Sequence, residues 1–307
     1  MKVLLVNHLQ QRCGVYQHGW RMAQALLKDN RYESEYLETN DQNEFIATVQ
    51  RFDPDFIMYN WHTATLQWFT PQISYQIKAK QLIFHHENEI PYHLNSNAII
   101  MADMTDNPMA NIYGLPRTLP KSTSLINVKN DIVTIGSFGF GFENKGFERV
   151  CQKVCNEYDN AVINLHITAA FFGDDAGIMA SNLSNRCLQI INKPGVTLNV
   201  TNHFVSDDQL VAFLGKNDIN LFLYNYEDNR GLSSAIDYAV AAGKPFGVSN
   251  STMFRHVLEI FPQVNAEINS IKNILEFENA PAMYFNAEWS DEKLKDKFYY
   301  ILEEVRK

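Results

Sequence analysis

Two segments of the chain place glycine, hydroxyl and charged residues where a phosphate group would bind. The first, residues 224–248 (YNYEDNRGLSSAIDYAVAAGKPFGV), predicts the end of a strand, a loop and a helix that opens at Gly231. At such a helix start the N–H groups of Gly231, Leu232 and Ser233 are free to bind a phosphate, and the charge of Arg230 assists them. A well-capped helix beside a solvated loop explains this segment alone about equally well.

The second segment, residues 131–149 (DIVTIGSFGFGFENKGFER), predicts a strand that leads into a loop with three glycines and Lys145, followed by a helix. A flexible backbone and a cation at the rim of a sheet suit a diphosphate. The segment is not a P-loop, because the terminal Lys-Ser/Thr pair is missing, and it lacks the G-x-G-x-x-G spacing of a dinucleotide fingerprint. It is weak evidence unless other segments agree with it.

The elements that must position these loops alternate between strand and helix. In the first half the apolar pattern predicts strands at 1–7, 54–59 and 81–84 and helices at 19–27, 45–52 and 71–77. In the second half it predicts strands at 132–135, 162–167, 196–200, 219–224 and 245–248 and helices at 146–158, 207–214 and 232–242. Such alternation predicts an α/β fold with two doubly wound parallel sheets, in which ligands bind at the carboxyl ends of the strands.

Two further segments complete this organisation. Breakers and small polar residues at 114–130 (GLPRTLPKSTSLINVKN) predict a linker between two domains. The last segment has an apolar stripe at Leu294, Phe298, Ile301 and Leu302 and predicts an amphipathic helix with Ser290 as its N-cap.

Composition excludes several classes of protein. The 307 residues are 46% hydrophobic and 20% charged, which is ordinary globular usage, and this length favours two domains. The net charge of −9 argues against a nucleic-acid binder. No apolar run reaches the roughly 18 to 20 residues of a transmembrane segment, and the first apolar run is too short for a signal peptide, so we expect a cytoplasmic protein. The four cysteines form no C-x-x-C pair and are expected to be buried thiols.

Taken in order, GSFGF…KG and FLYNYEDNRGLSSAIDYAVAAGKPFGVSNS resemble the C-terminal domain of GT-B glycosyltransferases of the family-4 (group 1) retaining type. MKVLLVNHLQQRCGVYQHG resembles the first strand and glycine loop of that family, and Phe84-His85-His86-Glu87 resembles its strand-end His-Asp. The resemblance implies two Rossmann-like domains facing across a cleft. Residues 1–125 would form the acceptor side and 126–285 the donor side, and helix 286–307 is a candidate to pack back on the N-terminal domain.

Residue by residue, Lys145 matches the family's lysine that contacts the donor diphosphate, and 231–233 match the helix start that receives the same group. His86 matches the histidine near the donor sugar, and Gly14 matches the glycine of the first loop. Ser137 and Phe138 stand where the family usually has an arginine, which Arg230 or Arg149 would replace.

The family's two glutamates are also changed. Aligning AVAAGKP puts Arg230 and Tyr238 at their positions, with Glu227, Asp228 and Asp237 close by. Asp237 or Glu227 is the predicted partner of the ribose hydroxyls, and a solvated position on a helix surface is the competing interpretation of Asp237.

Polar residues after the strands of the first half are candidates for the sugar side. His86 and His62 each follow a predicted strand, where an imidazole would bind sugar hydroxyls or accept a proton, although a loop histidine more often makes ordinary hydrogen bonds. Asn60 and Glu87 rank below them. The adjacent His-His-Glu cannot all reach one metal ion from an extended chain. The Asp53-Pro54-Asp55 string precedes a strand, at the wrong edge of the sheet, and is interpreted as a turn.

The resemblance therefore implies a hexosyl-type glycosyltransferase that moves a sugar from a nucleotide-diphosphate donor, such as a UDP or GDP sugar, to a glycan, lipid or protein acceptor. We expect it to retain configuration and to need no metal or other cofactor. The sets it implies are catalytic His86, Lys145 and Arg230; donor-binding Gly14, Ser137, Lys145, Glu227, Arg230, Gly231, Leu232, Ser233 and Asp237; and acceptor-side Asn60, His62 and Glu87.

Two other classes remain as alternatives. The changed arginine and glutamates would also suit a non-catalytic protein that binds nucleotide sugars or glycans on a decayed version of the same fold. A Rossmann oxidoreductase is supported only by the alternating pattern, because the glycine fingerprint after the first strand is missing.

Overall fold

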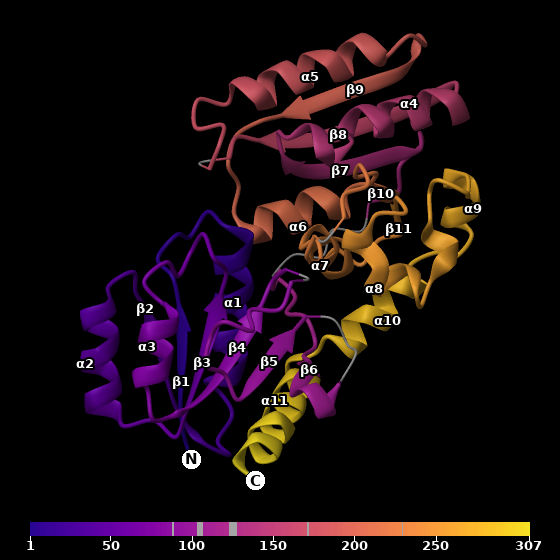
Figure 1. Cartoon of the computed structure of the whole chain (residues 1–307). Coiled ribbons are helices and arrows are strands. Elements are labelled where there is room, and N and C mark those ends of the chain that lie inside the picture. Colours follow the sequence, from indigo (N-terminus) through magenta and orange to yellow (C-terminus); the bar gives the residue numbers. More distant parts are fainter. Residues whose placement is uncertain (88, 103–106, 123–127, 171, 229) are drawn as a thin grey trace. The chain divides into compact units, whose positions relative to one another are not determined.

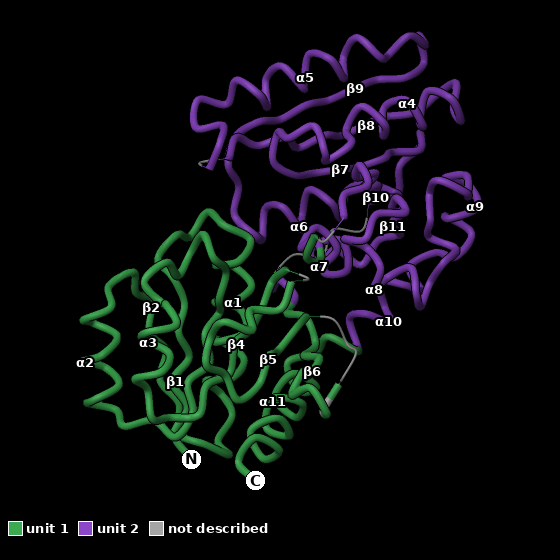
Figure 2. The backbone as a smooth tube through the Cα atoms, viewed as in Figure 1, with its two compact units in different colours: residues 1–118, 229–232, 288–307 green, residues 119–228, 233–287 purple. Residues whose placement is uncertain are grey.

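The computed structural model describes residues 1–87, 89–102, 107–122, 128–170, 172–228 and 230–307. The chain forms two compact units, drawn in different colours in Figure 2: unit 1 is residues 1–118, 229–232 and 288–307, and unit 2 is residues 119–228 and 233–287. Each unit is built on one parallel β-sheet (Figure 1). The predicted α/β fold class is confirmed. Within the described ranges, no helix is both long and apolar enough to cross a membrane.

The sheet of unit 1 has six parallel strands in the order β2-β1-β3-β4-β5-β6. Their bounds are β1 (Lys2–Asn7), β2 (Glu33–Glu38), β3 (Phe56–Trp61), β4 (Lys80–His85), β5 (Ala98–Met101) and β6 (Ile112–Gly114). The inner strands are apolar almost throughout because helices cover both of their faces. The sequence pattern missed β2, β5 and β6, since the edge strand β2 (ESEYLE) is half exposed and the other two are short.

Four helices cover that sheet, two on each face. α1 (Gly14–Leu26) and α11 (Asp291–Arg306) pack on one face, and α2 (Gln42–Phe52) and α3 (Pro71–Gln76) pack on the other. The predicted amphipathic helix is confirmed in α11: Ser290 caps it by accepting from Lys293 N, and its four stripe residues are buried against α1 and the sheet.

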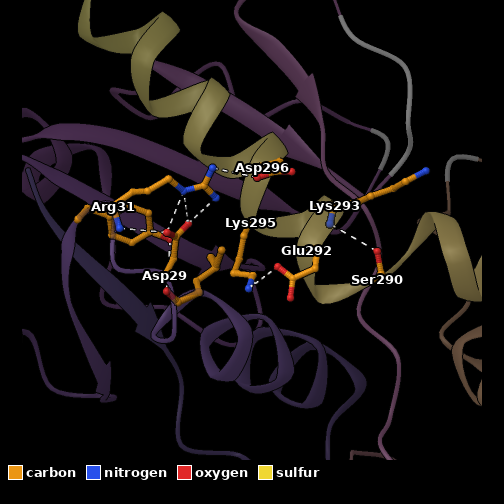
Figure 3. Close-up of polar contacts among 9 residues, drawn as sticks. Asp29, Arg31, Ser290, Glu292, Lys293, Lys295 and Asp296 are labelled. Atoms are coloured by element: carbon orange, nitrogen blue, oxygen red, sulfur yellow. Dashed lines mark hydrogen bonds and ion pairs between the residues drawn. The ribbon is translucent and has the colours of Figure 1, made fainter.

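Arg31 ties α11 to the end of α1 (Figure 3). Its guanidinium holds both carboxylate oxygens of Asp29, with Nη2–Oδ2 at 2.7 Å, and donates through Nη1 to Asp296 Oδ1 at 2.9 Å. The same group lies 4.7 Å from the ring centroid of Tyr299. These contacts join a residue early in the chain to its last helix.

The sheet of unit 2 has five parallel strands in the order β11-β10-β7-β8-β9. Their bounds are β7 (Thr134–Phe140), β8 (Asn160–Thr168), β9 (Gly195–Thr201), β10 (Ile219–Phe222) and β11 (Phe246–Val248). α4 (Phe147–Glu157), α5 (Ile178–Ile190) and α9 (Ile271–Leu275) cover one face, and α6 (Asp207–Gly215) and α7 (Ala235–Ala241) cover the other. Two further helices are α8 (Arg255–Leu258) and α10 (Ala280–Glu288).

Short 3₁₀ turns join several of these elements: η1 (Pro108–Ala110), η2 (Glu143–Lys145), η3 (Thr252–Phe254) and η4 (Pro262–Val264). The pattern had missed α5, α9 and α10, and it started the first helix at residue 19, whereas α1 begins at Gly14.

The glycine-rich loop predicted after residue 135 is wrong in part, because β7 runs on to Phe140 and includes Gly136 and Gly139. Gly136 serves close packing: a Cβ there would lie 1.9 Å from Asn217 Nδ2 and 2.4 Å from Asn220 Oδ1. Two buried amide side chains therefore occupy the space that a larger residue would need, and only the last glycines belong to a connection.

Asp53 and Asp55 lie at the amino-terminal edge of the unit 1 sheet. Asp53 ends α2 in a left-handed conformation with φ 50°, and Asp55 accepts from Lys2 N at 2.8 Å. They act as turn residues, as the sequence predicted. Most candidate site residues follow strands and lie at the opposite, carboxyl-terminal edges of the two sheets; Ser137 within β7 and Asp237 on α7 do not.

Candidate functional site

Lys145 is held at the carboxyl edge of the unit 2 sheet. It ends the 3₁₀ turn η2 after β7, and its Nζ lies 4.2 Å from the ring centroid of Tyr224, which follows β10. Gly146, with φ 67°, then starts α4, and a Cβ there would lie 1.8 Å from Leu223 O. The glycine thus lets the Lys145 turn contact the backbone after β10, and the aromatic face favours the ammonium by a cation–π interaction.

Glu227 lies in the same edge. Its Oε1 accepts from Asn144 Nδ2 at 2.9 Å, and its carbonyl accepts from Thr252 Oγ1 at 2.7 Å. Asn225 N donates to Asn144 O at 2.9 Å. The connections after β7, β10 and β11 are therefore fastened to one another around one half-buried carboxylate.

The sequence predicted a helix that opens at Gly231, and this start is wrong: α7 begins at Ala235, after Ser234. Gly231 packs instead against the backbone after β4, where a Cβ would lie 1.7 Å from His86 O. Its N–H donates to Glu87 Oε2 at 2.8 Å, and Ser233 N donates to Met253 O at 3.0 Å.

These bonds change the phosphate site that the sequence predicted. Of the three N–H groups, only that of Leu232 lacks a hydrogen-bond partner within the described ranges. A diphosphate at Gly231 must first displace the Glu87 carboxylate. Arg230 is exposed.

Two other donor-side candidates are buried inside unit 2. Ser137 is 1% exposed within β7, where the next residue, Phe138, packs edge-on against Phe222 and Tyr238. Asp237 is 0% exposed on α7, so the interpretation of it as a solvated surface residue is wrong. The Tyr238 hydroxyl donates to Asp207 Oδ1 at 2.7 Å. Glu227 is the more accessible of the two predicted ribose carboxylates.

At the carboxyl edge of unit 1, Asn60 and His86 form a hydrogen-bonded pair. His86 Nε2 lies 2.7 Å from Asn60 Oδ1, and the ring lies against those of His18 and Phe84 at centroid distances of 5.5 and 5.0 Å. Asn60 is 2% exposed at the end of β3. The structure therefore brings together two candidates that the sequence had listed separately for the donor sugar and the acceptor.

His62 and Glu87 form a second pair in unit 1. His62 Nδ1 accepts from Ala64 N at 3.1 Å, so its Nε2 carries the proton and faces Glu87 Oε1 at 3.4 Å. Burial alone would raise the pKa of Glu87, but hydrogen bonds from His62 and Gly231 N–H and the charge of Arg230 outweigh it and hold this pKa below its usual value. The Glu87 carboxylate is therefore ionised at neutral pH.

Burial keeps the rings of His8 and His86 at this edge uncharged at neutral pH. Burial lowers the pKa of His8, which directly follows β1, to about 4, and nearby His62 contributes. Burial also lowers the pKa of His86, with further lowering by nearby His62 and His85. His8 Nδ1 accepts from Gln10 N at 3.1 Å, and its buried Nε2 has no partner within the described part of the chain.

The remaining predicted residue, Gly14, is the first residue of α1 and is exposed. Within unit 1 the structure brings together Asn60, His62, His86, Glu87 and Gly231. Within unit 2 it brings together Lys145 and Glu227, whereas Ser137 and Asp237 lie in the interior. Sequence reasoning missed Asn7, His8, Asn144 and Tyr224; a polar residue that ends or follows an apolar strand was the available signal for Asn7 and His8.

Among the described residues, no three His, Cys, Asp or Glu side chains are arranged to hold a metal ion. Of the four cysteines expected to be buried, Cys151 and Cys155 on α4 and Cys187 on α5 are buried in the core, whereas Cys13 is only partly buried.

Comparison with solved structures gives likenesses along the whole chain. A crystal structure of Anabaena Alr3699/HepE in complex with UDP and glucose matches with a TM-score of 0.65 and 11% identity, covering 99% of each chain. A glycosyltransferase from Rickettsia africae matches with a TM-score of 0.67 and 11% identity, covering 100% of this chain and 98% of the other. AviGT4, a glycosyltransferase involved in avilamycin A biosynthesis, matches with a TM-score of 0.63 and 12% identity, covering 100% and 97%.

No protein-family model matches the chain, and no curated protein matches its sequence. At 11 to 12% identity the structural likeness shows a shared fold, and it confirms the predicted GT-B fold class.

Proposed function

We propose that this chain is a glycosyltransferase that moves a sugar from a nucleotide-diphosphate donor to a glycan, lipid or protein acceptor. The donor binds to unit 2 and the acceptor to unit 1. The observation that carries the proposal is the placement of Lys145 over Tyr224, beside Glu227, at the carboxyl edge of the unit 2 sheet. The fold is shared along the whole chain with HepE, whose structures contain UDP and UDP-glucose.

The chemical task of the unit 2 edge is to stabilise the departing nucleoside diphosphate. The Lys145 ammonium meets the negative charge that develops on the leaving group. Fixed charges of this kind lower the barrier by several kcal/mol in a site that excludes water. Arg230 belongs to unit 1 and is not part of this edge. Glu227 binds the ribose hydroxyls, because its carboxylate is half-buried and held by Asn144, whereas Asp237 is enclosed.

Glu87 of unit 1 competes with the donor for one of its predicted contacts. Its ionised carboxylate occupies the Gly231 N–H that a diphosphate oxygen would use. Donor binding through that N–H therefore replaces one anion by another, so its net gain is smaller than for a free N–H group. On the sugar side, His86 with Asn60 and His62 with Glu87 supply the polar groups for hydroxyls.

We further propose that transfer is of the hexosyl type, retains the configuration of the donor sugar and needs no metal. These statements rest on the family resemblance of the sequence motifs. A panel of UDP and GDP hexoses, assayed with and without a chelator and with the product anomer identified by NMR, tests all three.

The alternative is a non-catalytic protein that binds nucleotide sugars or glycans. It is favoured by Tyr238, which stands where the family has a glutamate and is engaged with Asp207, and by the Gly231 N–H that is already taken. Isothermal titration combined with a donor-hydrolysis assay separates the two functions. Binding without turnover of any donor in the panel would establish the alternative and end the proposal of an enzyme.

Lys145→Ala tests the catalytic proposal directly. Without the ammonium, turnover should fall by about 100- to 1,000-fold, the range seen when one preorganised group that stabilises developing charge is removed. The measurement is kcat for donor hydrolysis or transfer, with the melting temperature as a check on folding. The matched control is Lys193→Ala in the same unit, which removes a lysine paired with Asp159 and should leave kcat unchanged. An undiminished rate in Lys145→Ala would remove this residue from the site.

A further inference from the structure

The amide of Asn60 has only one orientation that satisfies its surroundings. Its Nδ2 donates to Val15 O at 2.8 Å and to Asn7 Oδ1 at 2.9 Å, which uses both amide hydrogens. The reverse orientation would set Oδ1 against the Val15 carbonyl oxygen, so two acceptors would face each other. Oδ1 therefore faces His86 Nε2, at 2.7 Å, and this nitrogen must carry the imidazole proton.

The amide orientation of Asn7, which accepts from Asn60, is fixed in the same way. Its Oδ1 accepts from His8 N at 2.9 Å as well as from Asn60. Its Nδ2 donates to Tyr16 O at 3.1 Å and to the Tyr36 hydroxyl at 2.9 Å. Since the main-chain N–H of His8 can only donate, the orientation of Asn7 is settled independently of Asn60.

The chain of bonds reaches a tyrosine hydroxyl. The Tyr36 hydroxyl accepts from Asn7, and Glu38 of the same strand accepts from Tyr16 Oη at 2.7 Å. Donation thus runs in one direction, from His86 through Asn60 and Asn7 to Tyr36. Hydrogen bonds in such a chain polarise one another, so the whole chain, and not Asn60 alone, favours the proton on His86 Nε2.

We propose that Asn60 is a positioning residue that holds His86 in the Nε2–H tautomer, so that His86 Nδ1 accepts a hydrogen bond from a sugar hydroxyl. Among the described residues, none hydrogen-bonds to Nδ1. The inference rests on the proposed function for the identity of the hydroxyl, which belongs to the donor sugar or to the acceptor. The tautomer itself is a property of the free protein.

A neutral amide suits this role better than a carboxylate would. Burial, with nearby His62, His85, Arg117 and His8, lowers the pKa of His86 and keeps the ring uncharged, and only an uncharged ring has a lone pair on Nδ1. An aspartate in place of Asn60 would draw a second proton onto the ring.

Gly19 makes the close fit of Asn60 possible. A Cβ on Gly19 would lie 2.3 Å from Asn60 Nδ2, so α1 can approach the amide only with glycine at this position. The contact blocks movement of the amide away from Val15 O and Asn7.

Nitrogen-15 NMR of the imidazole rings in the full chain tests the tautomer, with His86→Gln used to assign the His86 signals. In the wild type, Nε2 should be protonated and Nδ1 unprotonated. Asn60→Ala should give a mixture of tautomers. Asn60→Asp has nearly the same shape, although its second oxygen then faces Val15 O and Asn7 Oδ1. It should keep the Nε2–H tautomer while raising the pKa of His86 by about 1 to 3 units, the range for a carboxylate beside a titrating group.

The matched control is Asn220→Ala, which removes a fully buried asparagine of unit 2 that donates to Leu214 O. It should cost comparable stability without altering the His86 signals. A protonated Nδ1 in the wild type, or tautomer populations unchanged by Asn60→Ala, would overturn the proposal. If Asn60→Ala does not fold, the pKa of His86 in Asn60→Asp decides, and an unchanged pKa there would also overturn it.

Enzyme assays test the hydroxyl. Asn60→Ala should lower kcat by on the order of 100-fold, as for a misplaced reacting group, with a smaller effect on the KM of the donor. In Asn60→Asp the acid limb of the pH–rate profile should move to higher pH, because Nδ1 is then protonated at higher pH. Unchanged kcat and pH profile in an active enzyme would refute the hydroxyl contact while leaving the tautomer intact. If the wild type transfers no sugar from any donor, the hydroxyl contact is discarded together with the proposed function, and the tautomer is judged by NMR alone.

Discussion

Single residues at the carboxyl edge of unit 1 show how burial decides charge. His8 is 1% exposed, its Nδ1 is used by Gln10 N, and no described residue accepts from its Nε2. A second proton on this ring would create a buried cation that no carboxylate of the described residues contacts, so its pKa falls to about 4. The consequence is that His8, like His86, is an uncharged polar group, which suits hydroxyl groups better than anions.

The buried His8 ring should make stability depend on pH. In the unfolded chain histidine titrates near its ordinary value of about 6.5, whereas in the folded chain His8 takes up its proton only near pH 4. Between these values the unfolded state binds more protons, so the free energy of unfolding should fall as pH drops from about 6.5 to about 4 and be unaffected by His8 above that range. Denaturant unfolding of wild type and His8→Asn at several pH values measures the difference in slope.

The control for this experiment is His93→Asn, which removes an exposed imidazole of the same unit. If His8→Asn and the wild type lose stability in parallel between pH 6.5 and 4, the buried ring is not the cause of the pH dependence.

How far the sequence predicted the site differs from residue to residue. Lys145, His62, His86 and Glu87 could be proposed because each follows an apolar run that had to be a strand. The pairing of Asn60 with His86 could not, because it depends on the register of β3 against β4, which places Asn60 opposite Phe84. The Glu87–Gly231 bond joins residues 144 positions apart, and no periodic pattern carries such a contact.

At the scale of elements, most helices and strands with clear periodicity were predicted, and the errors share a cause. The sequence treats glycine and serine as breakers and caps, so it placed a loop at Gly136 and a helix start at Gly231. In the structure both glycines meet a neighbouring group too closely for any side chain: Asn217 at the first and His86 O at the second. Tertiary contact, rather than local conformation, selected glycine there.

Gly146 lies at the start of α4, where a positive φ angle and a close tertiary contact both require glycine. Gly146→Ala should destabilise unit 2 by about 2 kcal/mol or more, because φ 67° strains an L-residue by about 1 to 2 kcal/mol and the new Cβ would overlap Leu223 O. Gly243→Ala is the matched control: its φ of 65° is nearly the same, but nothing lies within 4 Å of the added Cβ, so only the strain remains. Denaturant unfolding measures both, and equal losses would show that the contact with Leu223 does not matter.

At the scale of the whole molecule, neither unit is a continuous piece of chain. Unit 1 takes residues 229–232 from within the sequence range of unit 2 and residues 288–307 from beyond it. The apolar stripe of the last helix could be recognised in the sequence, but the surface that it covers could not, because every parallel sheet offers two apolar faces. In the structure α11 covers the face of the sheet that α1 also covers, and Phe298 packs edge-on against Tyr32 there.

Phe298→Ala measures how much α11 contributes to unit 1. The ring is 0% exposed, so its removal should cost about 3 to 5 kcal/mol of unit 1 stability. Amide hydrogen exchange should show faster opening of β1 and β3 than of β7 and β8. Tyr300→Ala on the same helix removes a 43% exposed ring and should cost about 0.5 kcal/mol or less. Similar losses for the two variants would mean that the helix does not depend on its buried face.

The covering of the unit 1 sheet by α11 has a consequence for the order in which the protein is made. Residues 1–118 leave the ribosome with the apolar face of β1, β3 and β4 beside α1 still open, and it stays open throughout the synthesis of unit 2. Unit 1, which is translated first, can therefore finish folding only after unit 2 has been synthesised. Because transiently exposed apolar surface promotes aggregation, a nascent chain stalled before residue 288 should aggregate more readily than the finished protein.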